Sequence, residues 1–505
     1  MTDAKAYSAG APISGSALAC EQVDGLTRAF SGDRGNRVAR NAVTSSDVVK
    51  AARNPVTMRS YRDTFGVSLD AAKTVTNQRQ SGRCWLFSTL NVLRAKAMRA
   101  LDVDDFELSQ AYGMFYDKLE KANSFLENVV TTADRPWDDR AVAFILKEGF
   151  ADGGEWSYGS NLVAKWGAVP KDVMPETACS KNSAQMNDVL RRLLHKDAHR
   201  LRRLVAAGAS PDEVSALRAE LMAEVHRVLC SCLGEPPVHF DLEMEVGAKA
   251  EVDEGKVSEV LPLPGDAAED GSPDDGVSGA NAKKPRRLLR DRAITPREFV
   301  ERYVRFDPAD YVELVSIPGC GREFGHAYGL RWMDTVVGGR RLRFLNMPME
   351  VLEDAAVASL KAGVPMYMAC DVGQEFGRRL EDFPGVLACD TMDRDSLFDV
   401  DLSMTREEMY DSFESRLTHA MTFQGVELGE DGRPAAWRVE NSWGKESCKD
   451  GYLVMSGEWY RTYGGDVVVE RRFVPDEVLK LWDHAELEMQ DPWSGMGCAL
   501  SGIGR

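Results

Sequence analysis

The sequence of 505 residues has no run of about 20 apolar residues, the length that an α-helix needs to cross a bilayer. Its first residues, MTDAKAYSAGAPISG, contain no continuous apolar segment of the kind found in signal peptides. The ten cysteines stand singly except for Cys230 and Cys232, and neither a CxxC pair nor an HExxH motif occurs. These absences favour a cytoplasmic protein without membrane contact, disulfide framework, metal or cofactor.

Positive charge is also scarce. The chain has 62 Lys and Arg but 80 Asp and Glu, which gives a net charge of −18. Residues 241–282 hold twelve Asp or Glu against two Lys and are rich in Gly, Pro, Ala and Ser, a composition that predicts a solvated, mobile insertion. The basic run KKPRRLLRDR follows from Lys283. A nucleic-acid patch would explain it, but compensation of the acidic segment explains it better. The acidic balance speaks against nucleic acid as a partner.

The first half of the chain has helical periodicity and the second half does not. From Cys84, CWLFSTLNVLRAKAMRALD places apolar residues on one face, and Ser109 is suited to cap a second helix. Residues 184–233 predict a helical hairpin whose second helix starts with the capping sequence SPDE. Later segments such as HAMTFQGVEL and AAWRVENSW have the composition of strands. This order predicts an α+β fold in which two subdomains meet along a cleft.

The segment TNQRQSGRCWLFS raises the question whether Cys84 packs or reacts. Alone, a free cysteine is most often a small buried hydrophobe. A nucleophilic cysteine needs a base, a group that orients the base, and donors for the oxyanion. His419 at the start of one predicted strand and Asn441 at the end of another would supply the first two, if these strands are antiparallel neighbours. Gln78 lies six residues before Cys84, and a bend through Gly82 would return its amide to the sulfur.

The blocks NQRQSGRCWLF, LTHAMTFQGV and RVENSWG resemble the catalytic blocks of papain-like cysteine peptidases. More closely, FELSQAYGMFYDKLEKANSFLE, DGGEW, KWGAVPKDVMPET, EFVERYV and ACDVG resemble the bleomycin hydrolase and aminopeptidase C family over nearly the whole chain. The sequence departs from secreted papain-like enzymes because no second cysteine shortly precedes Cys84 and because His419 lies 335 residues after it. Both departures point to the intracellular branch.

The resemblance implies a papain-like fold, with a helical subdomain, a β-barrel-like subdomain and helical insertions. Each residue taken alone has an ordinary explanation as a strand, turn or core residue, and only their combination favours catalysis. The roles that the resemblance implies are Cys84 as nucleophile, His419 as general base and acid, Asn441 as orienter, Gln78 as oxyanion donor with the Cys84 N–H, Trp443 as a shield of the His–Asn contact, and Gly153 and Gly154 as aligners of an extended substrate.

Five parts are expected along the chain. They are an N-terminal arm that packs on the core (residues 1–70), a helical subdomain with the catalytic cysteine (71–180), a helical insertion with the acidic segment 241–282 (181–300), a β-rich subdomain with the catalytic histidine and asparagine (301–490), and a C-terminal arm (491–505).

In the family, the C-terminal arm ends in a sequence similar to WDPMGAL, enters the cleft, and holds the free amine of the substrate with its terminal carboxylate. Here the end is MQDPWSGMGCALSGIGR, which interrupts that pattern and adds five residues after Leu500. We expect an intracellular cysteine aminopeptidase that acts on peptides through an acyl-enzyme, with bleomycin-hydrolase-like amide hydrolysis as a related activity. The alternatives are an endopeptidase, if the tail does not anchor the amine, and a non-catalytic scaffold of the same fold. The resemblance also implies a homohexamer.

Overall fold

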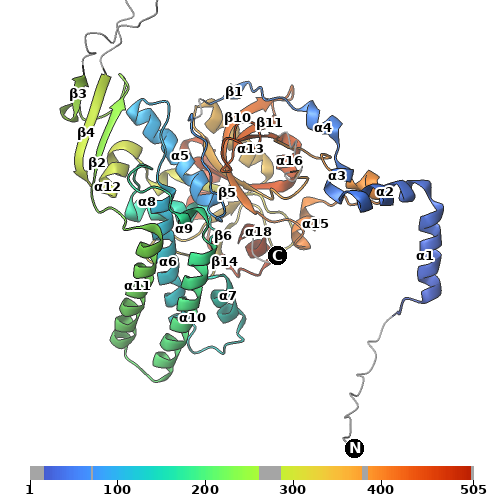
Figure 1. The fold of residues 1–505 in the computed structure, drawn as a ribbon, viewed down its shortest axis with the longest axis horizontal. Helices are drawn as coiled ribbons and strands as arrows, with labels where there is room; N and C mark the ends of the chain where they lie inside the picture. Colours follow the sequence, from blue (N-terminus) through green and yellow to red (C-terminus); the bar gives the residue numbers. More distant parts are fainter. Residues whose placement is uncertain (1–15, 70–71, 261–285, 378–384, 502–505) are drawn as a thin grey trace, which may run out of the picture.

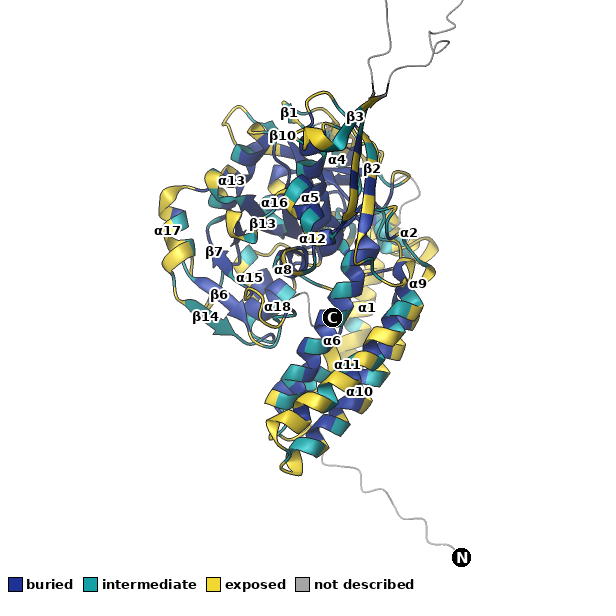
Figure 2. Ribbon diagram, turned by 90° about the vertical axis from the view of Figure 1, so that its left-hand side faces the viewer, coloured by how far each residue is buried: buried dark blue, intermediate teal, exposed yellow. Residues whose placement is uncertain are grey.

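The computed structural model describes residues 16–69, 72–260, 286–377 and 385–501. Figure 1 shows a body made of a large sheet with helices beside it, a long helical hairpin that projects from this body, and N-terminal helices that extend away on another side. In the second view, buried residues concentrate in the sheet and in the helices that face it, whereas the hairpin alternates buried and exposed faces (Figure 2). None of the helices in the described ranges is long and apolar enough to span a membrane.

The described part of the N-terminal arm is helical. Its helices are α1 (Cys20–Gly32), α2 (Arg34–Ser45), α3 (Val48–Ala52) and α4 (Pro55–Ser60). No residue of α1 or α2 is buried. Burial begins with Ala52 of α3 and Met58 of α4, and Met58 packs against Met392. Among the described residues of the arm, burial therefore begins only at α3, and α1 and α2 lie exposed.

The helical subdomain is built around a buried helix that begins at the candidate nucleophile. This helix, α5 (Cys84–Leu101), buries the predicted apolar face, including Leu86, Leu90 and Leu93. Ser109 caps the next helix as expected, because its side chain accepts a hydrogen bond from the backbone N–H of Tyr112. The remaining helices of this part are α6 (Gln110–Thr131), α7 (Arg140–Glu148), α8 (Trp156–Trp166) and α9 (Ala178–Lys181).

The predicted helical hairpin is present as α10 (Ala184–Ala206) and α11 (Pro211–Leu233). Ser210 and Glu213 form the expected capping box, with Pro211 in the first turn. Leu190, Leu194, Leu221 and Leu229 are fully buried between the hairpin and its neighbours, which include α6. The hairpin is therefore amphipathic and leans on the helical subdomain.

A small antiparallel sheet follows where the composition predicted a solvated insertion. Its strands are β2 (Phe240–Val246), β3 (Val257–Val260) and β4 (Arg286–Ile294), in the order β2-β4-β3. The prediction was wrong for residues 241–260, because buried Phe240, Leu242 and Val246 give β2 a strand alternation that average composition conceals. The rest of the acidic segment, from residue 261, lies outside the described residues.

The described part of the basic run, from residue 286, lies in β4 and pairs with acidic residues. Arg292 forms an ion pair with Asp241 at 2.9 Å and a second one with Glu243, and Arg287 pairs with Glu254. These pairs support charge compensation over a nucleic-acid patch as the role of the run.

The second half of the chain forms the main sheet, in the order β14-β6-β7-β5-β13-β8-β10-β11-β12-β9, with β1 (Val67–Ser68) also paired to β10. Its strands are β5 (Tyr311–Val315), β6 (Ala327–Leu330), β7 (Phe344–Asn346), β8 (Met366–Cys370), β9 (Val386–Leu387), β10 (His419–Leu428), β11 (Pro434–Glu440), β12 (Tyr452–Ser456), β13 (Gly464–Glu470) and β14 (Leu487–Gln490). One face packs on α5 and the helical subdomain, and the other encloses a second core with α13 (Met349–Lys361).

Short helices connect these strands and end the described chain. They are α12 (Pro296–Phe299), which continues into a π-helical turn (Val300–Val304), α14 (Arg394–Phe398), α15 (Arg406–Asp411), α16 (Gly457–Tyr463), α17 (Asp476–His484) and α18 (Gly495–Ser501). The predicted capping box of Thr295 and Glu298 is present at α12.

Candidate active site

Cys84 is the first residue of α5 and lies where this helix meets the start of β10. Burial raises the pKa of its thiol, and backbone N–H groups of Ala420, Trp85 and Cys84 itself oppose this rise by hydrogen bonding to the sulfur. The positive end of the helix dipole at the N-terminus of α5 also favours a thiolate. The contact with Ala420 places the sulfur directly beside the residue that follows His419.

His419 and Asn441 come together as the sequence predicts. The strands β10 and β11 are antiparallel neighbours, with Thr422 opposite Glu440, and this register brings the start of β10 next to the residue after β11. Nε2 of His419 and Oδ1 of Asn441 are 2.9 Å apart. Both side chains are buried. The amide oxygen of Asn441 therefore fixes the ring and accepts the Nε2 proton, which leaves Nδ1 as the proton acceptor.

Trp443 covers this pair. Its ring stacks on that of His419 with 5.1 Å between the centroids and 26° between the planes. Such a cover keeps water from competing for the His419–Asn441 hydrogen bond. The structure thus places Trp443 over the imidazole, and its role as a shield stays a prediction.

Gln78 connects the loop before the cysteine to the loop after β11. Its backbone N–H donates to the carbonyl of Ser442 at 2.8 Å, and its side-chain oxygen accepts from the Ser442 hydroxyl at 2.6 Å. Its Nε2 donates to the carbonyl of Ser81 at 2.8 Å. One of the two N–H groups of this amide is thus engaged inside the loop, and the other can donate to a further acceptor.

The bend before Cys84 has a different origin from the one expected. Arg79 is the residue with a positive φ, at 54°. Gly82 is needed for another reason: a Cβ at this position would lie 2.8 Å from the Cβ of Asp152. The N–H of Gly82 donates to the Asp152 carboxylate at 3.2 Å. Gly82 therefore lets the cysteine loop contact the segment that carries Gly153 and Gly154.

Arg83 is a structural residue of the site that the sequence analysis missed. It is 1% exposed and forms two hydrogen bonds with the Glu176 carboxylate, at 3.1 and 2.8 Å. Burial alone would raise the pKa of Glu176, but the hydrogen bonds from Arg83 outweigh it and hold this pKa below its ordinary value. A fixed pair of this kind anchors the residue next to the nucleophile. Glu176 lies in KWGAVPKDVMPET, one of the blocks that resemble the family, so the resemblance could have pointed to this residue.

Gly153 and Gly154 lie on the loop before α8, beside the cysteine loop. At Gly154 a Cβ would meet the rings of Trp85 and Tyr158 at 2.6 and 2.7 Å, so only glycine fits there. The carbonyl of Gly153 accepts a hydrogen bond from Lys121 at 2.7 Å. This loop is therefore held in place from two sides.

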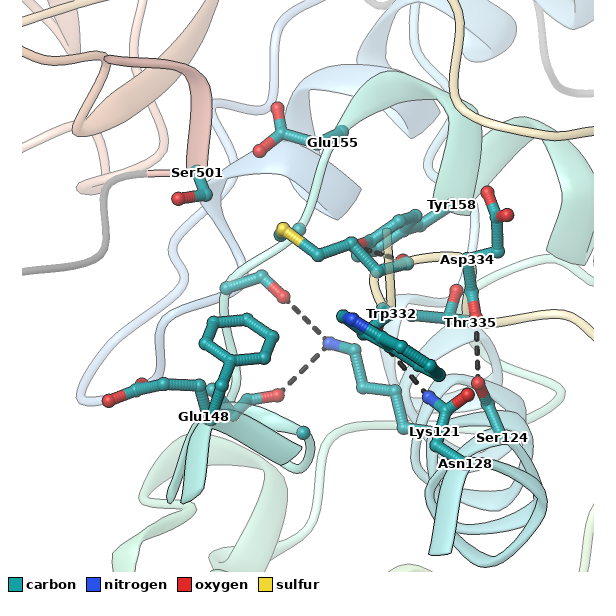
Figure 3. Close-up of a pocket in the computed structure, with 16 residues that line it drawn as sticks. Lys121, Ser124, Asn128, Glu148, Glu155, Tyr158, Trp332, Asp334, Thr335 and Ser501 are labelled. Atoms are coloured by element: carbon teal, nitrogen blue, oxygen red, sulfur yellow. Dashed lines mark hydrogen bonds between the residues drawn. The ribbon is translucent and has the colours of Figure 1, made fainter. Parts of the chain in front are cut away.

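Lys121 is a second residue that the sequence analysis missed. It reaches from α6 and donates to the carbonyls of Ala151 at 3.0 Å and of Gly153, as the dashed lines of Figure 3 show. Burial lowers the pKa of its ammonium group, and Asp117, which pairs with it at 3.0 Å, opposes that fall. Nothing in the local sequence distinguishes it from other helical lysines, because its role depends on a loop that lies 30 residues away.

A cavity of about 80 Å³ lies beside this loop and is called the arm cavity below. Its lining includes Lys121, Glu148, Gly153, Gly154, Glu155 and Ser501. Ser501 belongs to the C-terminal arm. This arm enters the site region because the carbonyl of Ala499 accepts from the N–H of Leu417, two residues before His419, at 2.8 Å. The four residues after Ser501, with the terminal carboxylate, lie outside the described residues.

A model of the peptidase C1-like family matches residues 17–258 and 273–497. The chain belongs to the peptidase C1-like family. This membership, together with the relatives below, makes it a cysteine peptidase and confirms the resemblance seen in the sequence blocks. The unmatched interval falls inside the acidic segment, so this segment is where the chain departs from the family model.

Relatives of known name cover nearly the whole chain. Aminopeptidase C of Lactobacillus delbrueckii subsp. lactis is 35% identical over 91% of this chain and 93% of its own length. Aminopeptidase W of the same organism is 34% identical over 95% and 99%. Human bleomycin hydrolase is 33% identical over 96% and 99%. The similarity therefore spans all the blocks that carry the candidate site.

The crystal structure of PepW from Lactobacillus rhamnosis HN001 matches with a TM-score of 0.83 and 34% identity, and the match covers 95% of this chain and 99% of that one. This agreement confirms the α+β, papain-like fold class that the sequence predicts.

Proposed function

We propose that the chain is a cytoplasmic cysteine aminopeptidase that removes N-terminal residues from peptides, with related amide bonds as further substrates. The observation that carries this proposal is the 2.9 Å hydrogen bond between His419 and Asn441 at the start of β10, where the backbone of the next residue, Ala420, lowers the pKa of the Cys84 thiol. The names of the relatives, aminopeptidases C and W and bleomycin hydrolase, support the same activity. All ten cysteines are free, which fits a reducing compartment.

The mechanism follows from the chemistry of these groups. His419 takes the thiol proton at Nδ1, and the thiolate of Cys84 attacks the carbonyl carbon of the first peptide bond. The N–H of Cys84 and the second N–H of the Gln78 amide stabilise the oxyanion. The imidazolium then protonates the departing amine, which leaves a thioester. Water activated by His419 hydrolyses this acyl-enzyme and restores the thiol.

An endopeptidase is the second candidate, favoured by the arm that continues past Leu500. The decisive experiment compares the full chain with a chain truncated after Leu500, each on peptides with free and with N-acetylated ends. An aminopeptidase cleaves the free peptides and spares the acetylated ones. Equal cleavage of both by the full chain would establish an endopeptidase instead.

Cys84→Ala serves as the control in the same assay and is expected to abolish turnover of every substrate. Alkylation of Cys84 by iodoacetamide at neutral pH separates both peptidases from a non-catalytic scaffold. A scaffold would leave this thiol no more reactive than an ordinary buried cysteine.

We further propose a homo-oligomer, with the hexamer as the family form. Helix α1 supports it, because it extends from the body (Figure 1) and exposes Val23, Leu26 and Phe30 by 45%, 63% and 42%. Apolar side chains that recur along one exposed helix suit a contact with another subunit.

A further inference from the structure

Residues 151–154, called the glycine loop below, lie between α7 and α8 and include the two glycines expected to align the substrate. Lys121 on α6 holds two carbonyls of this loop through the bonds drawn in Figure 3. The indole N–H of Trp85, the residue after the nucleophile, donates to the carbonyl of Asp152 at 2.8 Å. The backbone of the glycine loop, which also lines the arm cavity, is therefore fixed to α5 and α6.

The carboxylate of Asp152 joins the glycine loop to three other segments. Its Oδ1 accepts from the ammonium group of Lys118 on α6 at 2.6 Å and from the side-chain amide of Asn187 on α10 at 2.7 Å. Its Oδ2 accepts from the N–H of Gly82 at 3.2 Å and from the hydroxyl of Ser183, at the start of α10, at 2.5 Å. Each oxygen thus has two donors, which is a full set for an ionised carboxylate.

Asp152 and Lys118 form a buried ion pair, with side chains that are 15% and 0% exposed. Burial by itself would raise the pKa of Asp152, but the charge of Lys118 and the hydrogen bonds to the carboxylate outweigh it and hold this pKa below its ordinary value. The carboxylate is therefore ionised at neutral pH. An asparagine here would turn an NH2 group toward two of the four donors and would leave the Lys118 charge without its bonded counter-ion.

Asp152 holds the chain on both sides of the nucleophile. Its carboxylate binds Gly82, two residues before Cys84, and its carbonyl binds the side chain of Trp85, one residue after it. The residue that follows Asp152 is Gly153, the first of the two glycines expected to align the substrate. The position of the sulfur and the position of the bound peptide are thus both tied to one residue.

The helical hairpin contributes to this arrangement through the first residues of α10. Ser183 and Asn187 supply two of the four donors to Asp152. Met186 and Leu190 lie on the same stretch of α10 and are 2% and 0% exposed, so the start of the helix is anchored in the core. The hairpin therefore contacts the active-site loops directly and is more than an appendage of the helical subdomain.

We propose that Asp152 is a positioning residue for the reaction and that the helical hairpin acts on the reaction through it. The inference rests on the proposed aminopeptidase function, in which the substrate carbonyl must lie within reach of the Cys84 sulfur. The Asp152 side chain is fully engaged, so it acts through Gly82 and Gly153 and not by contact with the substrate. It sets the separation of the reacting groups, and a displacement of about 1 Å between such groups can lower a rate by about 100-fold.

The test compares Asp152→Asn with the double variant Asp152→Asn and Lys118→Met, which leaves no unpaired Lys118 charge buried. Steady-state kinetics on alanyl-methylcoumarylamide and thermal unfolding are measured for both. We expect kcat to fall about 100-fold in both variants, with KM changed by less than about 3-fold. The double variant should recover stability relative to the single one, because the unpaired charge is gone, but it should not recover kcat.

Asn187→Ala tests the contribution of the hairpin, because it removes one donor and keeps the ion pair. It should lower kcat by about 3-fold to 10-fold and leave thermal unfolding nearly unchanged. Asp188→Asn is the matched control on the same helix, since the side chain of Asp188 is 67% exposed and pairs only with Arg191 among the described residues. It should leave kcat, KM and stability unchanged. An unchanged kcat in Asn187→Ala would contradict the role of the hairpin.

Alkylation of Cys84 by iodoacetamide separates the alignment of the substrate from the reactivity of the thiol. This small reagent needs the thiolate but not the glycine loop. Its rate constant should therefore change far less than kcat in each of the variants.

Three results would overturn the inference. The first is a kcat that recovers together with stability in the double variant, which means a structural role. The second is a raised KM at unchanged kcat, which assigns Asp152 to substrate binding alone. The third is a loss of Cys84 alkylation equal to the loss of kcat, which means that Asp152 supports the thiol and not the alignment. In all three cases the wild type still cleaves, and the proposed function stands. A wild type that cleaves nothing and whose Cys84 does not alkylate would refute both.

Discussion

At the scale of single residues, the thiol of Cys84 depends on its histidine. Burial raises its pKa, and the backbone N–H groups around the sulfur only oppose that rise. A buried thiol with a raised pKa carries little thiolate at neutral pH unless a base takes its proton. His419 is held for this task by Asn441 at 2.9 Å and by the ring of Trp443.

His419→Ala should therefore slow the iodoacetamide alkylation of Cys84 at pH 7 by about 100-fold. The rate should recover as the pH rises, because the thiol then ionises without help. The measurement is the pH profile of alkylation, with the background of the other cysteines taken from Cys84→Ala. His326→Ala removes a half-buried histidine that pairs with Glu488 and should leave the profile unchanged. A wild-type rate in His419→Ala would refute the assigned base.

At the scale of elements, three segments hold the loop before α5. Gln78 ties it to Ser442, Gly82 to Asp152, and Arg83 to Glu176. These contacts bridge the helical subdomain and the main sheet, so the position of the nucleophile relative to the histidine depends on all of them. Loss of one partner of the Arg83–Glu176 pair would be costly, because the side chains are 1% and 9% exposed and the remaining charge would stay buried without a counter-ion.

Glu176→Gln should destabilise the protein by about 3 kcal/mol at pH 7, since it leaves the Arg83 charge buried and unpaired. The folded pKa of Glu176 lies below its ordinary value of 4.5, so its contribution to stability is complete above that pH and is lost as the pH falls through the folded pKa. Thermal unfolding at pH 7 and at acid pH measures this difference, which should shrink on acidification.

Glu220→Gln is the control for this experiment. It breaks the exposed pair with Arg200, in which Glu220 is 60% exposed, and should change stability by less than about 0.5 kcal/mol. A loss in Glu176→Gln that is equal at both pH values would mean that the ionised pair is not the cause.

At the scale of the whole molecule, the cleft and the arms are assembled from distant segments. The C-terminal arm reaches the site through Ala499 and is held against α7, where Phe144 and Arg140 contact the ring of Trp493. The N-terminal helices α1 and α2 instead extend from the body (Figure 1) with no buried residue. Isolated amphipathic helices of this length are marginal in water, so a contact with a second subunit would stabilise them.

Removal of residues 1–46 should therefore reduce the native mass of the oligomer, as measured by light scattering on a sizing column. Leu26→Asp combined with Phe30→Asp should act in the same direction without shortening the chain, because both residues lie on the exposed apolar face of α1. An unchanged mass in both variants, or a full-length protein that is already a monomer, would contradict the proposed role of these helices.

Much of the fold could be predicted because many helix and strand patterns depend on residues that are close in the sequence. The capping box of Ser210, the helix start at Cys84 and the strand at His419 depend on residues within one or two turns of each other. The strands of residues 240–260 were missed because acidic residues on the exposed side dominated the composition. Gly82 was expected to provide a bend. Instead, glycine is needed at this position because the loop packs closely against Asp152, which lies 70 residues away in the sequence.

The sequence by itself determined the α+β class and the order of Gln78, Cys84, His419 and Asn441, because each stands in a distinct local pattern. Only the tertiary structure decided which groups surround them. Lys121 supports a loop that begins 30 residues later, and the charge of Asp466, more than 300 residues away in the chain, contributes to the raised pKa of Glu155. The cost of burying a charge depends on neighbours in space, and those neighbours come from segments whose proximity no local pattern encodes.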